Sequence, residues 1–154
     1  MAINKIPAGT RGAKTPPKAL LKALLPLMQR IHRRKGDTFR GSPLLYLTTV
    51  GAKSGQERTH PVARFDDGTG GWWICASFGG AQQHPAWYLN IVAHPDQVKA
   101  EVNGKNQRVQ VEQLDGADYD EAWASIVSQA KNFAGYRKNT DRVLPVLRLT
   151  PLND

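Results

Sequence analysis

The stretch that most constrains the fold lies between residues 44 and 77, where three strand-like segments follow one another without a helix between them. Residues 44–50 are apolar and rich in β-branched side chains. Residues 58–65 and 71–77 follow, joined by aspartates and glycines that suit a hairpin turn. Pro61 cannot donate to a sheet ladder, which predicts that its strand lies at an edge or carries a bulge.

The rest of the chain adds helices and strands without the regular βα alternation of a doubly wound fold. We expect helices at 85–93 and 118–133, the second ended by Gly135. Pro145 predicts an edge or irregular start for the last strand. The remaining predicted strands are 98–103, 108–114 and 143–150. This pattern predicts a mainly β, α+β chain with flanking helices, its antiparallel strands closed into a small barrel.

The positive charge is confined to one end of the chain. The sequence has 154 residues and a net charge of +8, and residues 1–40 hold ten lysines and arginines but one acid. The remaining residues are close to neutral, and their length suits a single core. We therefore divide the chain into a basic N-terminal arm, residues 1–40, and a main domain, residues 41–154.

Within the arm, residues 18–35 place leucines and basic residues on different faces of a predicted helix, with Pro26 expected to kink it. Residues 5–17 are predicted to be a flexible lead-in. Three interpretations stay open: packing on the barrel, contact with an anionic membrane, and nucleic-acid binding, of which the last is weakest because no aromatic platform accompanies the basic residues. No apolar run is long enough to span a bilayer. We expect a cytoplasmic protein, peripheral at the inner face of the membrane if the arm binds lipid.

Three clusters of turn and polar residues predict a site for one anionic, planar ligand. Residues 51–55 (GAKSG), with Arg58 beyond them, combine close backbone approach with groups that bind phosphate. A P-loop is excluded because Tyr46 stands where its first glycine belongs. Residues 76–80 (ASFGG) and 84–90 (HPAWYLN) add backbone groups, aromatic area and an amide. Taken alone, the first turn could be a plain hairpin.

Other single residues carry less information. Cys75 is the lone cysteine, so an intrachain disulfide is excluded, and its apolar neighbours favour a buried thiol. His60 and His84 have no partners at metal-ligand spacing, so we assign no metal.

Residues 48–58, 76–80, 84–88 and 140–142, with Pro145, together resemble the deazaflavin-dependent nitroreductase family. The resemblance covers roughly residues 40–151. It implies a split β-barrel of the FMN-binding, pyridoxamine-phosphate-oxidase-like type that binds coenzyme F-420, an 8-hydroxy-5-deazaflavin with a phosphate and an oligoglutamate tail. The implied activity is hydride transfer from the reduced coenzyme to a hydrophobic, electron-poor acceptor: a quinone, an activated alkene or a nitro compound.

The resemblance also implies roles for individual residues. Lys53, Ser54 and Arg58 would hold the phosphate and the start of the tail. The backbone of residues 75–78 and the side chains of Trp87 and Tyr88 would flank the ring, with core packing as the alternative for both aromatics. The full set of implied coenzyme contacts is Lys53, Ser54, Arg58, Thr59, Pro61, Val62, Ala63, Cys75, Ala76, Ser77, Phe78, Ala86, Trp87, Tyr88 and Asn90.

The acceptor site implied by the resemblance contains Phe133 and Tyr136, and Tyr136 is the predicted proton donor. Phe133 stands where relatives carry a tyrosine, which argues against reduction of bicyclic nitroimidazoles. Ala52 and Phe78 stand where relatives often carry basic residues, so weaker binding of the tail is expected.

Two alternatives to this function remain. One is a split-barrel oxidoreductase that binds FMN. The other is a non-catalytic protein that binds a cofactor or a lipid. We expect no nucleic-acid partner, and the sequence leaves the oligomeric state open.

Overall fold

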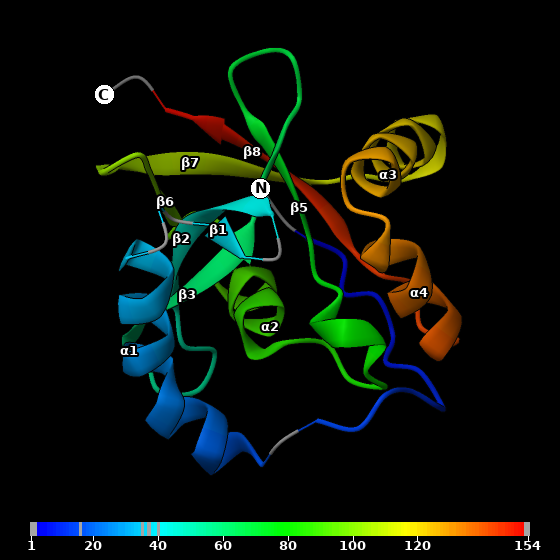
Figure 1. Cartoon of the computed structure of the whole chain (residues 1–154), viewed down its shortest axis with the longest axis horizontal. Helices are drawn as coiled ribbons and strands as arrows, with labels where there is room; N and C mark the ends of the chain where they lie inside the picture. The colour runs from blue at the N-terminus through cyan, green and yellow to red at the C-terminus, as the bar shows by residue number, and fades with distance from the viewer. Residues whose placement is uncertain (1–2, 16, 35, 37, 40, 153–154) are drawn as a thin grey trace.

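The computed structural model describes residues 3–15, 17–34, 36, 38–39 and 41–152 (Figure 1). Its described strands form one curled sheet in the order β1-β2-β6-β7-β8-β5-β4, with β3 paired to β2. Every strand pair is antiparallel, which agrees with the predicted barrel. The strands are β1 (Thr38–Phe39), β2 (Ser42–Val50), β3 (Glu57–Ala63), β4 (Phe65–Asp66), β5 (Trp72–Cys75), β6 (Lys99–Val102), β7 (Lys105–Gln113) and β8 (Val146–Pro151).

Strand β3 lies at the edge that Pro61 predicted. Its ladder in the described part of the chain is with β2 alone, where Pro61 lies opposite Tyr46. The register is continuous from Glu57 to Ala63, so the strand has no bulge in this ladder. Because the outer side of β3 makes no ladder there, a residue without an N–H is tolerated.

Of the two alternatives that Pro145 predicted for the last strand, the irregular start is found and the edge position is not. The strand begins only at Val146, three residues after its predicted start at residue 143. Strand β8 pairs with both β5 and β7. Pro145 stands one residue before the strand begins, and its carbonyl accepts the N–H of Ala76 at 2.9 Å. The proline therefore leaves the central ladder intact.

The single helix expected at residues 118–133 is broken into two. Helix α3 (Gly116–Gln129) ends at Ala130, and α4 (Asn132–Asn139) follows, with Gly135 inside it rather than ending a helix. The break brings Phe133 into the core, where its ring meets that of Phe65 edge-on at 5.6 Å. The spacing of apolar residues along the sequence could not show that this ring is buried against Phe65, or that the helix breaks between α3 and α4.

Two cores lie on opposite faces of β5 and β8. Helix α2 (Ala86–Ala93) packs into the first core beside Leu45, Leu47 and Ile74. Helices α3 and α4 cover the second core, which contains Cys75 and Phe133. Figure 1 shows α2 between the β2–β3 pair and β5, while α3 and α4 stand together on the far side of β5. Consecutive residues of β5 thus contribute to different cores, and Cys75 faces the helices α3 and α4.

Most of the predicted flexible lead-in, residues 5–13, is instead docked on the domain, while residue 16 lies outside the described residues. Ile3 lies in the first core, and the N–H groups of Gly9 and Ala13 donate to the carbonyls of Gln82 and Gly80 at 2.8 and 3.0 Å. Thr10 donates through its backbone and side chain to the Asp141 carboxylate. These contacts hold residues 3–13 against the segment that leads into α2.

The predicted amphipathic helix is present as α1 (Lys18–Arg34), with Pro26 inside it. The predicted last residue, Lys35, lies outside the described residues. Gln29 Nε2 donates to the Thr59 carbonyl at 2.8 Å, and Arg33 pairs with Glu101 at 2.8 Å. The barrel leaves several apolar side chains of α1 exposed: Leu20, Leu24, Leu27, Met28 and Ile31. No helix in the described ranges is long and apolar enough to cross a membrane.

Candidate functional site

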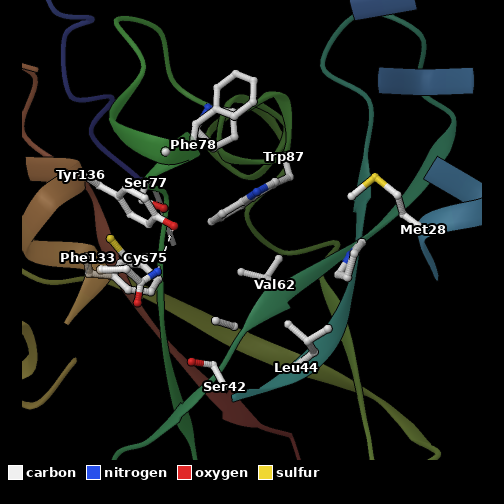
Figure 2. Close-up of a pocket in the computed structure, with 15 residues that line it drawn as sticks. Met28, Ser42, Leu44, Val62, Cys75, Ser77, Phe78, Trp87, Phe133 and Tyr136 are labelled. Atoms are coloured by element: carbon white, nitrogen blue, oxygen red, sulfur yellow. Dashed lines mark hydrogen bonds between the residues drawn. The ribbon is translucent and has the colours of Figure 1, made fainter. Parts of the chain in front are cut away.

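A cavity of about 240 Å³ opens between β3, β5, α2 and α4 (Figure 2). Val62 and Trp87 line one side, and Cys75 and Tyr136 line the other. Met28 of α1 closes a further wall. None of the lining residues carries a formal charge; they are Met28, Ser42, Leu44, Pro61, Val62, Ala63, Cys75, Ser77, Phe78, Gly79, Pro85, Trp87, Asn132, Phe133 and Tyr136.

The cavity gathers residues that are far apart in the sequence and that the resemblance had implied. Strand β3 contributes three of them, β5 contributes one, the β5–α2 connection contributes two, and the helices contribute the other three. The implied residues that line the cavity are Pro61, Val62, Ala63, Cys75, Ser77, Phe78, Trp87, Phe133 and Tyr136. Met28, Ser42, Leu44 and Asn132 are lining residues that sequence reasoning missed.

The implied phosphate-binding turn lies outside the cavity, at the other end of β3. Its backbone closes through bonds from Gly51 N to Gln56 O (2.8 Å) and from Gly55 N to Gly51 O (3.0 Å), with Gly55 at φ +69°. Lys53 and Ser54 are exposed there. Arg58 stands three residues before Pro61, so about 10 Å of extended strand separates the basic end from the cavity.

One face of β3 links the turn to the cavity. Arg58, His60 and Val62 alternate along the strand and therefore share a face. His60 Nδ1 is buried and has no hydrogen-bond partner within the described residues. Burial, with a contribution from the Arg58 charge, lowers the pKa of His60 below its ordinary value. A neutral ring with an available nitrogen thus lies between the cation and the cavity.

Asn90 fixes the turn from below. Its Nδ2 donates to Thr49 Oγ1 at 3.1 Å, and its Oδ1 accepts the N–H of Ala52 at 3.0 Å. Both polar atoms of this buried amide are therefore used within the protein. Asn90 sets where α2 meets the turn, which is a structural role that the sequence did not distinguish from ligand contact.

Four other implied residues also lie outside the cavity lining. Tyr88 is completely buried, donates to Gln113 Oε1 at 2.6 Å and accepts the N–H of Ile6, so it is a core residue while its neighbour Trp87 lines the cavity. Ala76 is buried behind the wall, and Ala86 is exposed at the first turn of α2. The Thr59 carbonyl accepts from Gln29, as described above.

The side of the cavity formed by α4 contains a hydroxyl held by a hydrogen bond. Asn132 Nδ2 donates to the Tyr136 hydroxyl oxygen at 2.9 Å, and the Tyr136 ring meets Phe133 at 5.3 Å. The four-residue spacing of Asn132 and Tyr136 on one helix is the signal that could have identified this pair. Nearby, burial raises the pKa of Cys75 to about 12, which keeps the thiol protonated as part of an apolar wall.

A buried arginine stands behind the wall formed by residues 76–81. Arg142 is 3% exposed. Its Nη1 donates to Ala76 O (2.9 Å), Nη2 to Ser77 O (2.7 Å) and Nε to Ala81 O (2.9 Å). Burial lowers its pKa, yet a guanidinium stays protonated in proteins. Sequence reasoning placed residue 142 in a motif but assigned it no role.

His84 completes this network in a defined tautomer. Arg142 Nη1 lies 2.9 Å from His84 Nδ1, and His84 Nε2 lies 2.6 Å from the Ile6 carbonyl. Because a guanidinium can only donate and a carbonyl can only accept, Nδ1 must be unprotonated and Nε2 must carry the hydrogen. Burial, the largest cause, lowers the pKa of His84, which agrees with a neutral ring.

These features fit a planar ring that carries an anionic tail. The walls that Val62, Trp87 and Phe78 contribute are apolar, and Ser77 adds a half-buried polar side chain. His60 Nδ1, which has no hydrogen-bond partner within the described residues, and the Arg58 cation lie on β3, and the Lys53 cation lies in the turn before it. A concave apolar pocket with a few convergent polar groups is the usual form of a cofactor site.

Comparison with known proteins agrees with this geometry. The family model for F420H(2)-dependent quinone reductase matches residues 23–151. An F420H(2)-dependent quinone reductase of Mycobacterium tuberculosis is 36% identical over 135 residues, which cover 82% of this chain and 89% of the relative.

Solved structures show the same fold. An F420-H2 dependent reductase, FDR-A, superposes with a TM-score of 0.63 at 33% identity, covering 70% of this chain and 93% of that chain. A structure described as a domain-swapped dimer matches with the same TM-score at 29% identity, covering 84% and 98%. The Vibrio cholerae protein HutZ, 13% identical with a TM-score of 0.55 and 85% and 92% covered, shares the fold alone. The chain therefore belongs to the F420H(2)-dependent quinone reductase family, as an oxidoreductase that uses coenzyme F-420 on a split β-barrel of the FMN-binding type.

Proposed function

We propose that this protein reduces a quinone-type, hydrophobic acceptor, and that the cavity of Figure 2 is where the acceptor meets the reduced coenzyme. The observation that carries the proposal is an uncharged, largely apolar cavity joined along β3 to an exposed cationic turn. A quinone fits this lining because its ring is apolar and its burial leaves no charge without a partner. The relatives named quinone reductases support the same acceptor class.

In this proposal, Lys53, Ser54 and Arg58 hold the phosphate and the first part of the acidic tail. The exposed turn lets these side chains reach a ligand without a desolvation cost. Ala52 offers no charge there, so the coenzyme tail makes fewer charge-assisted bonds than a turn with a basic residue would provide.

The bound coenzyme supplies the hydride, and the protein supplies orientation and a proton. Val62 and Trp87 would face the ring, and the backbone of residues 75–78 would meet its polar edge. A quinone that takes up a hydride also needs one proton on its second oxygen to become a hydroquinone. Tyr136, whose hydroxyl is fixed by Asn132 at the cavity wall, is positioned to give that proton and recover it from solvent.

Ligand titration followed by turnover tests the proposal. The fluorescence of oxidised coenzyme F-420 should weaken or shift in wavelength when the coenzyme binds. Lys53→Ala and Arg58→Ala should each weaken the affinity by about tenfold at low salt and by less at high salt. Ser125→Ala, on the far side of α3, is the matched control. Equal affinity for FMN, or unchanged affinity in both variants, would place the ligand elsewhere. Failure of the parent to oxidise reduced coenzyme with any quinone would leave a binding protein.

The location of the protein is a separate proposal, based on α1. Leu20, Leu24 and Leu27 are exposed, Leu27 at 53%, and Arg30 and Arg34 are exposed on the same helix. Apolar area beside cations matches the surface of an anionic membrane, where each basic residue contributes about 1 kcal/mol. Because Met28 of this helix lines the cavity, a lipophilic quinone could enter from the membrane. We propose a cytoplasmic protein that binds the inner membrane face reversibly.

Removing the whole arm would also remove Ile3 from the core, so point variants make the sharper test. Replacing Leu20, Leu24 and Leu27 by serine should abolish sedimentation with phosphatidylglycerol vesicles at low salt. Val143→Ser, which removes another exposed apolar side chain, should leave sedimentation unchanged. Parent protein that stays in the supernatant would refute membrane binding. A loss of dimer mass in the triple variant would instead assign the apolar face to a second copy of the chain.

A further inference from the structure

Arg142 is a buried cation whose neighbours give it no counterion. Within the described residues, no carboxylate lies in ion-pair distance of its guanidinium. The adjacent Asp141 is turned away, where its carboxylate accepts from Thr10 and Arg11. In the described part of the chain, all four acceptors of Arg142 are neutral: three backbone carbonyls and the unprotonated Nδ1 of His84. The positive charge is therefore hydrogen-bonded but not neutralised.

This charge lies directly behind one wall of the cavity. Ser77, Phe78 and Gly79 line the cavity, and the carbonyls that Arg142 binds belong to Ala76, Ser77 and Ala81, on either side of this wall. Figure 2 shows Ser77 across the cavity from Val62 and Trp87. The guanidinium is thus bonded to the backbone of the wall that borders the space where a ligand would lie.

The wall needs such support because its backbone is unusual. Phe78, Gly79 and Gly80 follow one another with φ of 45°, 64° and 81°. A left-handed conformation is strained for phenylalanine, so surrounding bonds must hold it. Arg142 binds the carbonyls that flank this bend and so fixes its position.

The charge should act on a ligand with little screening. The cavity lining holds no charged residue, and Arg142 is 3% exposed, with Ala76 and Ala81 of the wall also buried. Salt screens exposed charges over about 8 Å at physiological ionic strength but screens buried charges much less. A cation in this position favours a ligand whose ring is anionic over one whose ring is neutral.

We propose that Arg142 is a positioning residue that fixes the wall of residues 76–81 and, through its charge, makes the cavity prefer the anionic form of a hydroxydeazaflavin ring. This inference rests on the proposed placement of the coenzyme ring against Ser77 and Phe78. The 8-hydroxyl is a vinylogous acid, and its anion spreads charge across the ring to the pyrimidine carbonyls. The preference therefore does not depend on which edge of the ring meets the wall.

Two tail-less probes separate this effect from binding of the phosphate and the tail. The first probe, 8-hydroxy-5-deazariboflavin, has an anionic ring when the pH is above the pKa of its hydroxyl. The second, 5-deazariboflavin, lacks this hydroxyl and stays neutral. The parent protein should bind the anionic probe more tightly by at least about threefold, the order of effect of one charge roughly 10 Å away in a partly hydrated protein. The preference should persist in high salt, unlike any contribution from Lys53.

Arg142→Gln should bring the ratio of the dissociation constants of the two probes towards one. Arg142→Lys, which keeps the charge, should retain most of the preference for the anionic probe. Lys53→Ala should leave it unchanged while weakening the full coenzyme. If Arg142→Gln does not fold, the parent's preference in high salt and the Arg142→Lys variant still decide the matter. Equal binding of the two probes by the parent, or an equal loss for both in Arg142→Gln, would overturn the inference. Because no turnover is measured, absence of quinone reduction would refute the proposed function without touching this result.

Discussion

Replacing Asn90 by alanine would test whether this side chain holds in place the turn of residues 51–55, which we propose to bind the coenzyme. The amide joins Thr49 to the N–H of Ala52 and is 8% exposed. Its loss leaves the fully buried Thr49 hydroxyl without this partner, at a cost of about 1–3 kcal/mol, while Ala52 is exposed and its N–H can turn to water at about 0.5–1.5 kcal/mol. The expected total is about 2–4 kcal/mol.

A loss of this size should be visible in two assays. For a domain of about 150 residues, each kcal/mol lowers Tm by roughly 2–4 °C, so calorimetry should show a decrease of about 4–16 °C. Fluorescence titration with coenzyme F-420 should show weaker binding, because Lys53 and Ser54 lie on the turn that Asn90 holds. Stability is measured without coenzyme, which separates the structural role from ligand contact.

A double-mutant cycle supplies the control. Thr49→Val removes the hydroxyl that Asn90 satisfies, so Asn90→Ala should cost less in that background, by about 1 kcal/mol. Additive losses would show that the two side chains do not depend on each other. Unchanged coenzyme affinity in a destabilised Asn90→Ala protein would refute the view that the turn binds the coenzyme.

Three further predictions concern the cavity and its surroundings. Tyr136→Phe should lower kcat by about tenfold or more in stopped-flow turnover while coenzyme Kd stays constant, and an unchanged kcat would make solvent the proton source. Gly80→Ala should lower the midpoint of urea unfolding, because Gly80 has φ +81° and an added Cβ would collide with the Tyr136 carbonyl oxygen. An unchanged midpoint would mean that α4 can shift to make room. Burial lowers the pKa of His84 below 6.5, so its contribution to stability is complete above pH 6.5 and lost as pH falls through the folded-state pKa. His84→Asn should therefore flatten the dependence of unfolding free energy on pH below 6.5, and a dependence equal to that of the parent would contradict this reasoning.

Short-range patterns in the sequence were sufficient for the element types and for the family. Alternation and β-branching predicted the strands, Pro61 predicted an edge, and the leucine spacing predicted α1. The motif set led to the coenzyme and to most of the cavity wall. These signals lie within a few residues of one another, where steric preference and side-chain period act directly.

Contacts between distant residues decided the rest. Ile3 enters a core built by residues beyond position 44, α3 breaks where Phe133 turns towards Phe65, and Tyr88 packs inward beside the cavity-lining Trp87. Arg142 gained its role from carbonyls more than sixty residues earlier in the chain. Local preference determined which residues could form a helix, a strand or a turn. Only the folded, curled sheet determined which side chains share the cavity, because that depends on burial and hydrogen bonding between segments that the sequence keeps apart.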